Sequence, residues 1–177
     1  MRLITSDQFA TQAWKNGGGV THEIARADRD GRLLWRLSIA EVTSDGPFSA
    51  FPGLTRILTV IEGAGLYLDT PDGRLDALPL APVRFSGELP ITSRLIDGPV
   101  RDFNLIWDAA RLAASVSTVS GPLPDCPPAP GRSYAFLALA PFDTMAIPQG
   151  AVSLFEHASA QTSGEARGLL VTFEQTA

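Results

Sequence analysis

Cysteine and histidine are scarce in this chain of 177 residues, which contains one cysteine and two histidines. Cys126 cannot form an internal disulfide, and its surroundings, "PLPDCPPAP", contain no histidine or lysine that would activate the thiol. A metal site of two histidines and one carboxylate would need His22 and His157 to converge with Glu23, Glu62 or another acid. We therefore expect neither a metal nor a cofactor, and we interpret Cys126 as a loop residue.

Long apolar runs and clusters of basic residues are also missing. No segment approaches the roughly 18 apolar residues of a membrane-spanning helix, and no apolar stretch of a signal peptide follows the N-terminus. The net charge is -5, and the basic residues are scattered singly, so no basic stripe is available to follow a phosphate backbone. The sequence predicts a cytoplasmic protein that binds neither membranes nor nucleic acids, and it leaves the oligomeric state open.

Nucleotide-binding loops and the serine-hydrolase motif GxSxG are absent as well, although the chain has a glycine run, "WKNGGGV", at residues 14–20. The alternating residues after this run favour a strand over the helix that a phosphate loop requires. Two interpretations stay open. The run is a bend that enters the first strand with Trp14 as its hydrophobic anchor, or Lys15 and the backbone amides of residues 16–19 bind a small carboxylate.

Short alternating segments separated by turns are what the chain does contain. In "RLLWRLSIAEV" the apolar residues recur with period two. In "RDFNLIWD" the same period places Phe103, Leu105 and Trp107 on one side and Asp102, Asn104 and Ile106 on the other. With 16 glycines and 14 prolines as punctuation, the pattern predicts an all-β sandwich or barrel.

A proline-rich segment, "SGPLPDCPPAPG" at residues 120–131, is the best internal boundary because its prolines disfavour a paired central strand. We therefore expect a first barrel with its N-terminal segment at residues 1–119, a connector at 120–131, and strands at 132–177. A segment as short as 132–177 is marginal as an independent fold, so it should pack against the first part or complete it.

Arg56 is the most interesting isolated cation, because it opens "RILTVIEG" directly after the aromatic and glycine bend "FSAFPGLT". At such a position its planar fork would grip a ligand carboxylate at a barrel mouth, or it would be a surface arginine at a strand end. Asp102 and Asn104 likewise face either a polar cavity or solvent. No pair of carboxylates stands out for acid-base catalysis.

Three phrases together resemble the HutD/Ves family of cupin-type proteins: "WKNGGGVTHEIA", "WRLSIAEVTSDGPFSAFPGLTRILTVIEGAGL" and "LIDGPVRDFNLIWD". The resemblance extends from about Trp14 to Asp108. It implies a cupin-type β-barrel in a bicupin-like arrangement with a smaller second barrel. It also implies a cytoplasmic, regulatory role in histidine utilisation through binding of urocanate or formylglutamate, whereas Ves-type members are associated with stress response. Metal-dependent cupins typically use three histidines and a glutamate, a set that this chain lacks.

The resemblance, together with the residue chemistry, defines an expected ligand-binding set. Arg56 would grip a carboxylate, the loop from Lys15 would close the anion site, and the acids and amide would orient polar ligand atoms. The expected ligand-binding residues are Lys15, Asn16, Gly17, Gly18, Glu23, Phe51, Arg56, Asp102 and Asn104. The main alternative is an isomerase or hydrolase that uses Glu23, and a further one is a structural or interaction protein. His22 stands where the family commonly has arginine, so a ligand contact made by that arginine would be lost in this member and its ligand or affinity would differ.

Overall fold

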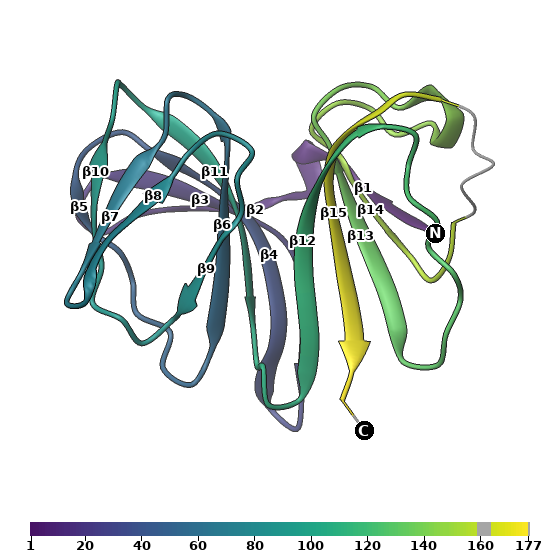
Figure 1. Ribbon diagram of the computed structural model, residues 1–177, viewed down its shortest axis with the longest axis horizontal. Helices are drawn as coiled ribbons and strands as arrows, with labels where there is room; N and C mark the ends of the chain where they lie inside the picture. Colours follow the sequence, from purple (N-terminus) through teal and green to yellow (C-terminus); the bar gives the residue numbers. More distant parts are fainter. Residues whose placement is uncertain (159–163, 177) are drawn as a thin grey trace. The chain divides into compact units, whose positions relative to one another are not determined.

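The protein is described by a computed structural model that covers residues 1–158 and 164–176. Within these residues it consists of β-strands and two short 3-10 turns, η1 (Ser6–Gln8) and η2 (Asp143–Met145). The predicted all-β class is therefore confirmed. The chain divides into two compact units, and Figure 1 labels their strands. The first unit comprises Ala10–Ala109, and the second comprises Met1–Phe9 with Ala110–Ala177.

The first unit is built from two antiparallel sheets. Its six-stranded sheet has the order β2-β3-β4-β11-β6-β9, and its four-stranded sheet has the order β5-β10-β7-β8. The strands are β2 (Ala10–Ala13), β3 (Gly19–Arg29), β4 (Arg32–Val42), β5 (Gly46–Pro47), β6 (Thr55–Glu62), β7 (Leu66–Thr70), β8 (Gly73–Ala77), β9 (Val83–Ser86), β10 (Thr92–Leu95) and β11 (Val100–Trp107). Apolar side chains from both sheets, including Leu58, Leu66 and Val100, form one buried cluster between them. The two sheets thus enclose a common interior.

The neighbouring strands β4 and β11 show why the sequence alternates in these segments. Leu37 is paired with Leu105 and Ile39 with Phe103, and all four are at most 1% exposed. The intervening residues, whose side chains point to the other face of the sheet, are more polar. Both faces of these central strands are therefore buried, and polar residues occupy the face that is turned to the interior of the first unit.

The second unit is organised around a five-stranded antiparallel sheet in its described residues, with the order β1-β14-β13-β15-β12. The strands are β1 (Arg2–Ile4), β12 (Leu112–Gly121), β13 (Arg132–Ala138), β14 (Val152–Phe155) and β15 (Ala166–Gln175). Its core includes Tyr134 stacked on Phe155 and Phe136 packed on Phe142. Figure 1 shows the N-terminal strand β1, in purple, beside β14, which is far from it in sequence.

The boundaries of the units differ from those expected from the sequence. Residues 110–119 belong to the second unit because β12 pairs with β15 along its whole length, from Leu112 to Gly121. The N-terminal segment also belongs there, since Arg2–Ile4 pairs with β14. Residues 120 and 121 end β12, and residues 122–131 connect β12 to β13 of the same sheet, so the proline-rich segment does not link the two units. Cys126 is completely buried in this unit and forms an isolated bridge with Ala158, and burial raises the pKa of its thiol.

None of the described segments forms a helix with the length and apolarity that a crossing of the bilayer requires.

The glycine run forms the turn between β2 and β3. The Trp14 amide donates to the Gly19 carbonyl at 2.9 Å, the Gly17 amide donates to the Trp14 carbonyl at 3.1 Å, and Gly17 has a φ of 71°. The Trp14 indole donates to the Thr21 hydroxyl at 2.8 Å and packs edge-on against Phe48. The interpretation as a bend with Trp14 as its anchor is therefore confirmed.

Gly19 is predicted to be the least replaceable residue of this run. A Cβ atom at Gly19 would lie 2.4 Å from the Glu41 carbonyl oxygen and 3.1 Å from the Trp14 ring. Gly19→Ala should lower the free energy of unfolding by about 1–3 kcal/mol, because backbone and indole must both shift. Gly46→Ala is the control, since its Cβ would meet nothing closer than 3.8 Å. Denaturant unfolding of both variants measures the difference, and equal stabilities would contradict the prediction.

Candidate functional site

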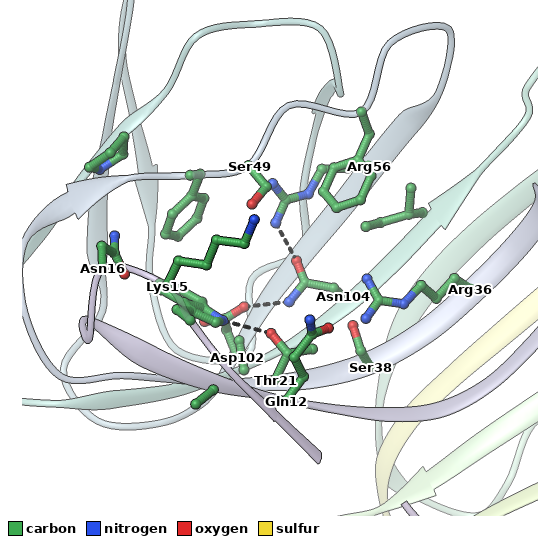
Figure 2. A pocket seen from close by; sticks show the side chains of 17 residues that line it. Gln12, Lys15, Asn16, Thr21, Arg36, Ser38, Ser49, Arg56, Asp102 and Asn104 are labelled. Carbon is green, nitrogen blue, oxygen red and sulfur yellow. Dashed lines mark hydrogen bonds between the residues drawn. The ribbon is translucent and has the colours of Figure 1, made fainter. Parts of the chain in front are cut away.

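A cavity of about 550 Å³ lies within the first unit. Its walls come from β2, β3, β4, β6 and β11 and from the two loops at residues 13–16 and 47–51. Figure 2 shows the charged and amide side chains of these elements pointing toward one another. Six of the nine expected ligand-binding residues line the cavity, namely Lys15, Asn16, Phe51, Arg56, Asp102 and Asn104, whereas Gly17, Gly18 and Glu23 do not.

The strand register explains why the polar groups meet at this place. Asp102 lies between Ala40 of β4 and Val60 of β6, and Asn104 lies between Ser38 and Leu58. Alanine and serine are small, so the β4 side of Asp102 and Asn104 leaves room for a ligand. One row further along the sheet, Arg36 and Arg56 flank Ile106 from its two sides. Alternation with period two thus places both arginines, the acid and the amide on one face.

Arg56 is a buried cation, with 7% of its surface exposed. Its guanidinium group lies 5.2–5.4 Å from the ring centres of Phe48, Phe51 and Phe85, at distances typical of cation–π contacts. One terminal nitrogen donates to the Asn104 side-chain oxygen at 2.7 Å, while Nε has no hydrogen-bond partner. Burial lowers the pKa of Arg56 to about 10, so the group still carries its charge at neutral pH. The surface-arginine interpretation is wrong.

Asp102 is a buried acid in the same cavity, with 1% of its surface exposed. Its Oδ1 accepts a hydrogen bond of 2.6 Å from the Asn104 amide nitrogen, and its Oδ2 has no partner. Burial raises the pKa of Asp102 to about 6, although the hydrogen bond from Asn104 and the charge of Arg56 oppose this rise. Asp102 and Asn104 therefore face the polar cavity and not solvent.

Arg36 is the second arginine of the cavity wall, and Glu23 holds it in place. The Arg36 Nε donates to Glu23 Oε2 at 2.6 Å, and both side chains are partly exposed. Glu23 does not line the cavity. Glu23 therefore positions Arg36, whereas the sequence predicted that Glu23 itself would contact the ligand.

The loop before the glycines contributes Lys15 and Asn16 to the cavity wall. Figure 2 shows the Lys15 side chain extending from this loop toward the Arg56 end of the cavity. Asn16 Oδ1 accepts a hydrogen bond of 3.1 Å from the Gly18 amide, and the Gly17 amide is bonded within the turn. The amides of Gly17 and Gly18 are therefore used inside the hairpin and are not available to bind an anion.

Several lining residues were missed by the sequence analysis. They are Gln12, Ala13, Trp14, Thr21, Arg36, Ser38, Ala40, Pro47, Phe48, Ser49 and Ile106. The alternation in β4 was a usable signal for part of this set, because it places Arg36 and Ser38 on the face opposite Leu37. Phe48 stands in the same aromatic bend as Phe51, which was expected.

A metal centre finds no support in the described part of the chain, where no three histidine, cysteine or acidic side chains group as ligands. The His22 ring lies outside the cavity wall and contacts the Thr11 hydroxyl at 2.9 Å and Glu41 Oε1 at 3.3 Å.

The family model HutD matches residues 6–170. The chain belongs to the HutD family. It is 39% identical over 125 residues to an uncharacterized 21.2 kDa protein in the hutC 3′ region of Pseudomonas putida. It is also 39% identical over 111 residues to protein Ves of Escherichia fergusonii. The aligned segments cover 68% and 60% of this chain but only 65% and 57% of the two relatives.

Solved structures extend the HutD likeness over almost the whole chain. The structure of HutD from Pseudomonas fluorescens SBW25 has a TM-score of 0.83 at 29% identity and 99% coverage of both chains. A conserved protein of unknown function from Pseudomonas aeruginosa PAO1 has a TM-score of 0.80 at 27% identity, with coverage of 99% of this chain and 98% of that one. The predicted cupin-type fold and the HutD/Ves resemblance are both confirmed.

The raised pKa of Asp102 makes a prediction about stability. Because the folded state favours the neutral acid, stability is fully present at low pH and is lost as the pH rises through about 6. Asp102→Asn removes this loss, so the free energy of unfolding of the variant relative to wild type should improve by on the order of 3 kcal/mol between about pH 4 and pH 7.5. Urea unfolding at both pH values measures this change.

Asp69→Asn is the control for this measurement. Asp69 is hydrogen-bonded to Arg94, which lowers the pKa of its carboxyl group. Its stabilising effect is therefore lost as the pH falls, and Asp69→Asn should become less stable relative to wild type as the pH rises. A stability difference between Asp102→Asn and wild type that stays constant with pH would show that folding does not raise the pKa of Asp102.

Proposed function

We propose that this protein binds a small metabolite with a carboxylate group, such as urocanate or formylglutamate, and acts as a regulator in histidine utilisation. The observation that supports the proposal best is the buried charge of Arg56. Its only hydrogen bond among the described residues is to a neutral amide, and no carboxylate of this part of the chain is within salt-bridge distance. A buried cation is costly unless an anion compensates it. Asp102 is separated from Arg56 by the Asn104 amide, so it compensates the charge only at a distance, whereas a ligand carboxylate would do so directly.

The size and composition of the cavity fit such a ligand. Small-molecule sites commonly have volumes of roughly 300–1,000 Å³ and combine apolar walls with a few polar groups. Here a cavity of about 550 Å³ has Phe48 and Phe51 beside the Arg56 guanidinium. Its polar groups would bind the carboxylate while the phenyl rings contact the carbon skeleton of the ligand.

The regulatory and pathway parts of the proposal rest on the family. The Pseudomonas putida relative is named for its place in the hutC 3′ region, and the matching family model is HutD. We extend this association with the histidine-utilisation locus to the present chain, together with a cytoplasmic location. The proposal needs no metal or cofactor, and it gives the protein a small metabolite as its partner.

Calorimetric titration with urocanate and formylglutamate tests the binding proposal. Arg56→Ala should weaken binding by about 10- to 100-fold, because charge-assisted hydrogen bonds are worth about 1.5–3 kcal/mol each. Arg56→Lys retains a charge but loses the planar fork, so we expect it to restore only part of the affinity.

Arg94→Ala is a matched control for these variants, because it removes the same charge from an exposed side chain of the four-stranded sheet, outside the cavity. It should bind like wild type. Thermal melting of all variants separates loss of binding from loss of fold. The proposal fails if Arg56→Ala binds these acids as tightly as Arg94→Ala does, or if wild type binds none of them.

A catalytic function is the second candidate, and Asp102 is the residue that favours it. An acid with a pKa of about 6 in a cavity is suited to proton transfer near neutral pH, whereas Glu23 is paired with Arg36 outside the cavity wall. If the protein converts these acids, Asp102→Asn should abolish turnover and Glu23→Gln should reduce it less. Chromatographic analysis of the products decides whether the protein converts these acids. If an acid binds in calorimetry but no product forms, catalysis on that acid is excluded.

A further inference from the structure

Asp102 and Arg56 are the most deeply buried ionisable side chains of the cavity wall, and the Asn104 amide joins them. Asn104 accepts from Arg56 at 2.7 Å through its oxygen and donates to Asp102 Oδ1 at 2.6 Å through its nitrogen. Asp102 Oδ2 and Arg56 Nε have no hydrogen-bond partner. One cation and one acid therefore line the same cavity, and each has a buried polar atom without a hydrogen-bond partner among the described residues.

The strands beside Asp102 provide no other hydrogen bond to its carboxyl group. On β4 the residue opposite is Ala40, and on β6 it is Val60, neither of which has a polar side chain. The next residue of β11 on the same face of the sheet is Asn104, and its amide donates to Oδ1 only. A polar partner for Oδ2 must therefore come from the cavity itself.

Three other charged side chains surround this part of the cavity. Arg36 of β4 is paired with Glu23 of β3, so its charge is already balanced. Lys15 of the preceding loop is exposed, and water screens its charge. Arg56 of β6 is consequently the cation whose charge compensates an ionised Asp102, and Asn104 adds a separate hydrogen bond to the same carboxyl group.

We propose that Asp102 takes up a proton when a ligand carboxylate binds Arg56, and that the cavity thereby selects ligands that place a hydrogen-bond acceptor at Asp102. This inference rests on the proposed function. A ligand carboxylate brings a second anion into a space that holds a single buried cation, and two carboxylates that share such a site do not both stay ionised. Protonated Asp102 has an O–H group in addition to its acceptor oxygen, so it can donate to a ligand carbonyl such as the formyl oxygen of formylglutamate.

The charges balance at the Arg56 end of the cavity, where one of the two carboxylates of formylglutamate would bind, while its second carboxylate would lie at the exposed side of the cavity near Lys15. The ligand brings one negative charge to the Arg56 end of the cavity, and one proton from the solvent neutralises Asp102. Asn104 keeps both of its hydrogen bonds, because Oδ1 of the protonated acid still accepts from its amide. Burial already raises the pKa of Asp102 to about 6, so a modest further rise moves its titration into the neutral range.

Calorimetry with formylglutamate as the probe tests this inference, because the carboxyl groups of the probe have ordinary pKa values of about 4 and stay ionised throughout. At about pH 7, titrations in buffers of different ionisation enthalpy should report uptake of up to one proton per ligand bound. The affinity of wild type should fall by up to about tenfold for each pH unit above the pKa of free Asp102. Asp102→Asn, which mimics the neutral acid, should show no proton uptake, an affinity independent of pH, and binding about tenfold or more tighter than wild type near pH 8.

His22→Asn is the control, because it replaces an imidazole of the same unit that lies outside the cavity wall. It should keep the proton uptake of wild type. Binding of the probe without proton uptake, or uptake that persists in Asp102→Asn, overturns the inference and leaves the proposed function standing. Failure of wild type to bind the probe at any pH from about 5 to 8 overturns both for this ligand.

Discussion

The hydrogen-bonded series from Arg56 through Asn104 to Asp102 is the constraint on which the rest of the cavity depends. Charges are expensive to bury, and here both ends of the series are buried while the middle is a neutral amide. The amide fixes the two groups without letting them form a direct ion pair. Each end therefore keeps an unsatisfied polar atom, which a structural salt bridge would have consumed.

The two central strands, β4 and β11, provide apolar burial that helps the fold to tolerate the buried Arg56 and Asp102. On β4 and β11 one face is formed by tightly buried apolar side chains, among them Leu37, Phe103 and Leu105. The other face contains the polar residues of the cavity. Burial of this apolar face stabilises the fold by roughly 25 cal/mol per Å² of apolar surface, which helps to offset the cost of an acid and an arginine on the opposite face.

The alternation of apolar and polar residues correctly predicted the strands. It also predicted that β11 has one apolar face and one more polar face, because a period of two is a property of the local backbone. It left two choices for Arg56, Asp102 and Asn104, since periodicity does not tell which face is covered. The sheet register resolves this choice. Residues far apart in sequence, such as Arg36 and Arg56, come together only through their pairing with β11, and no local pattern encodes that pairing.

Similar physical causes explain why Gly17, Gly18 and Glu23 do not line the cavity and why the boundary near residue 119 was misplaced. Glycine-rich turns can present amides to an anion, but in this hairpin the Trp14 carbonyl and the Asn16 side chain take up the amides of Gly17 and Gly18. Glu23 has a carboxylate of the kind that binds ligands, but this carboxylate accepts a hydrogen bond from Arg36. The boundary near residue 119 was misplaced because prolines mark an irregular segment without showing which sheet the neighbouring strands join, and β12 pairs with the distant β15.

A crystal structure of the protein with formylglutamate bound is the most direct test of the central claim, which is that the buried Arg56 is an anion receptor. We expect a ligand carboxylate within hydrogen-bond distance of the Arg56 guanidinium group, between the rings of Phe48 and Phe51, with the Arg56 to Asn104 hydrogen bond retained. A ligand bound outside this cavity, or one whose carboxylates contact only Lys15 and Arg36, would contradict the account.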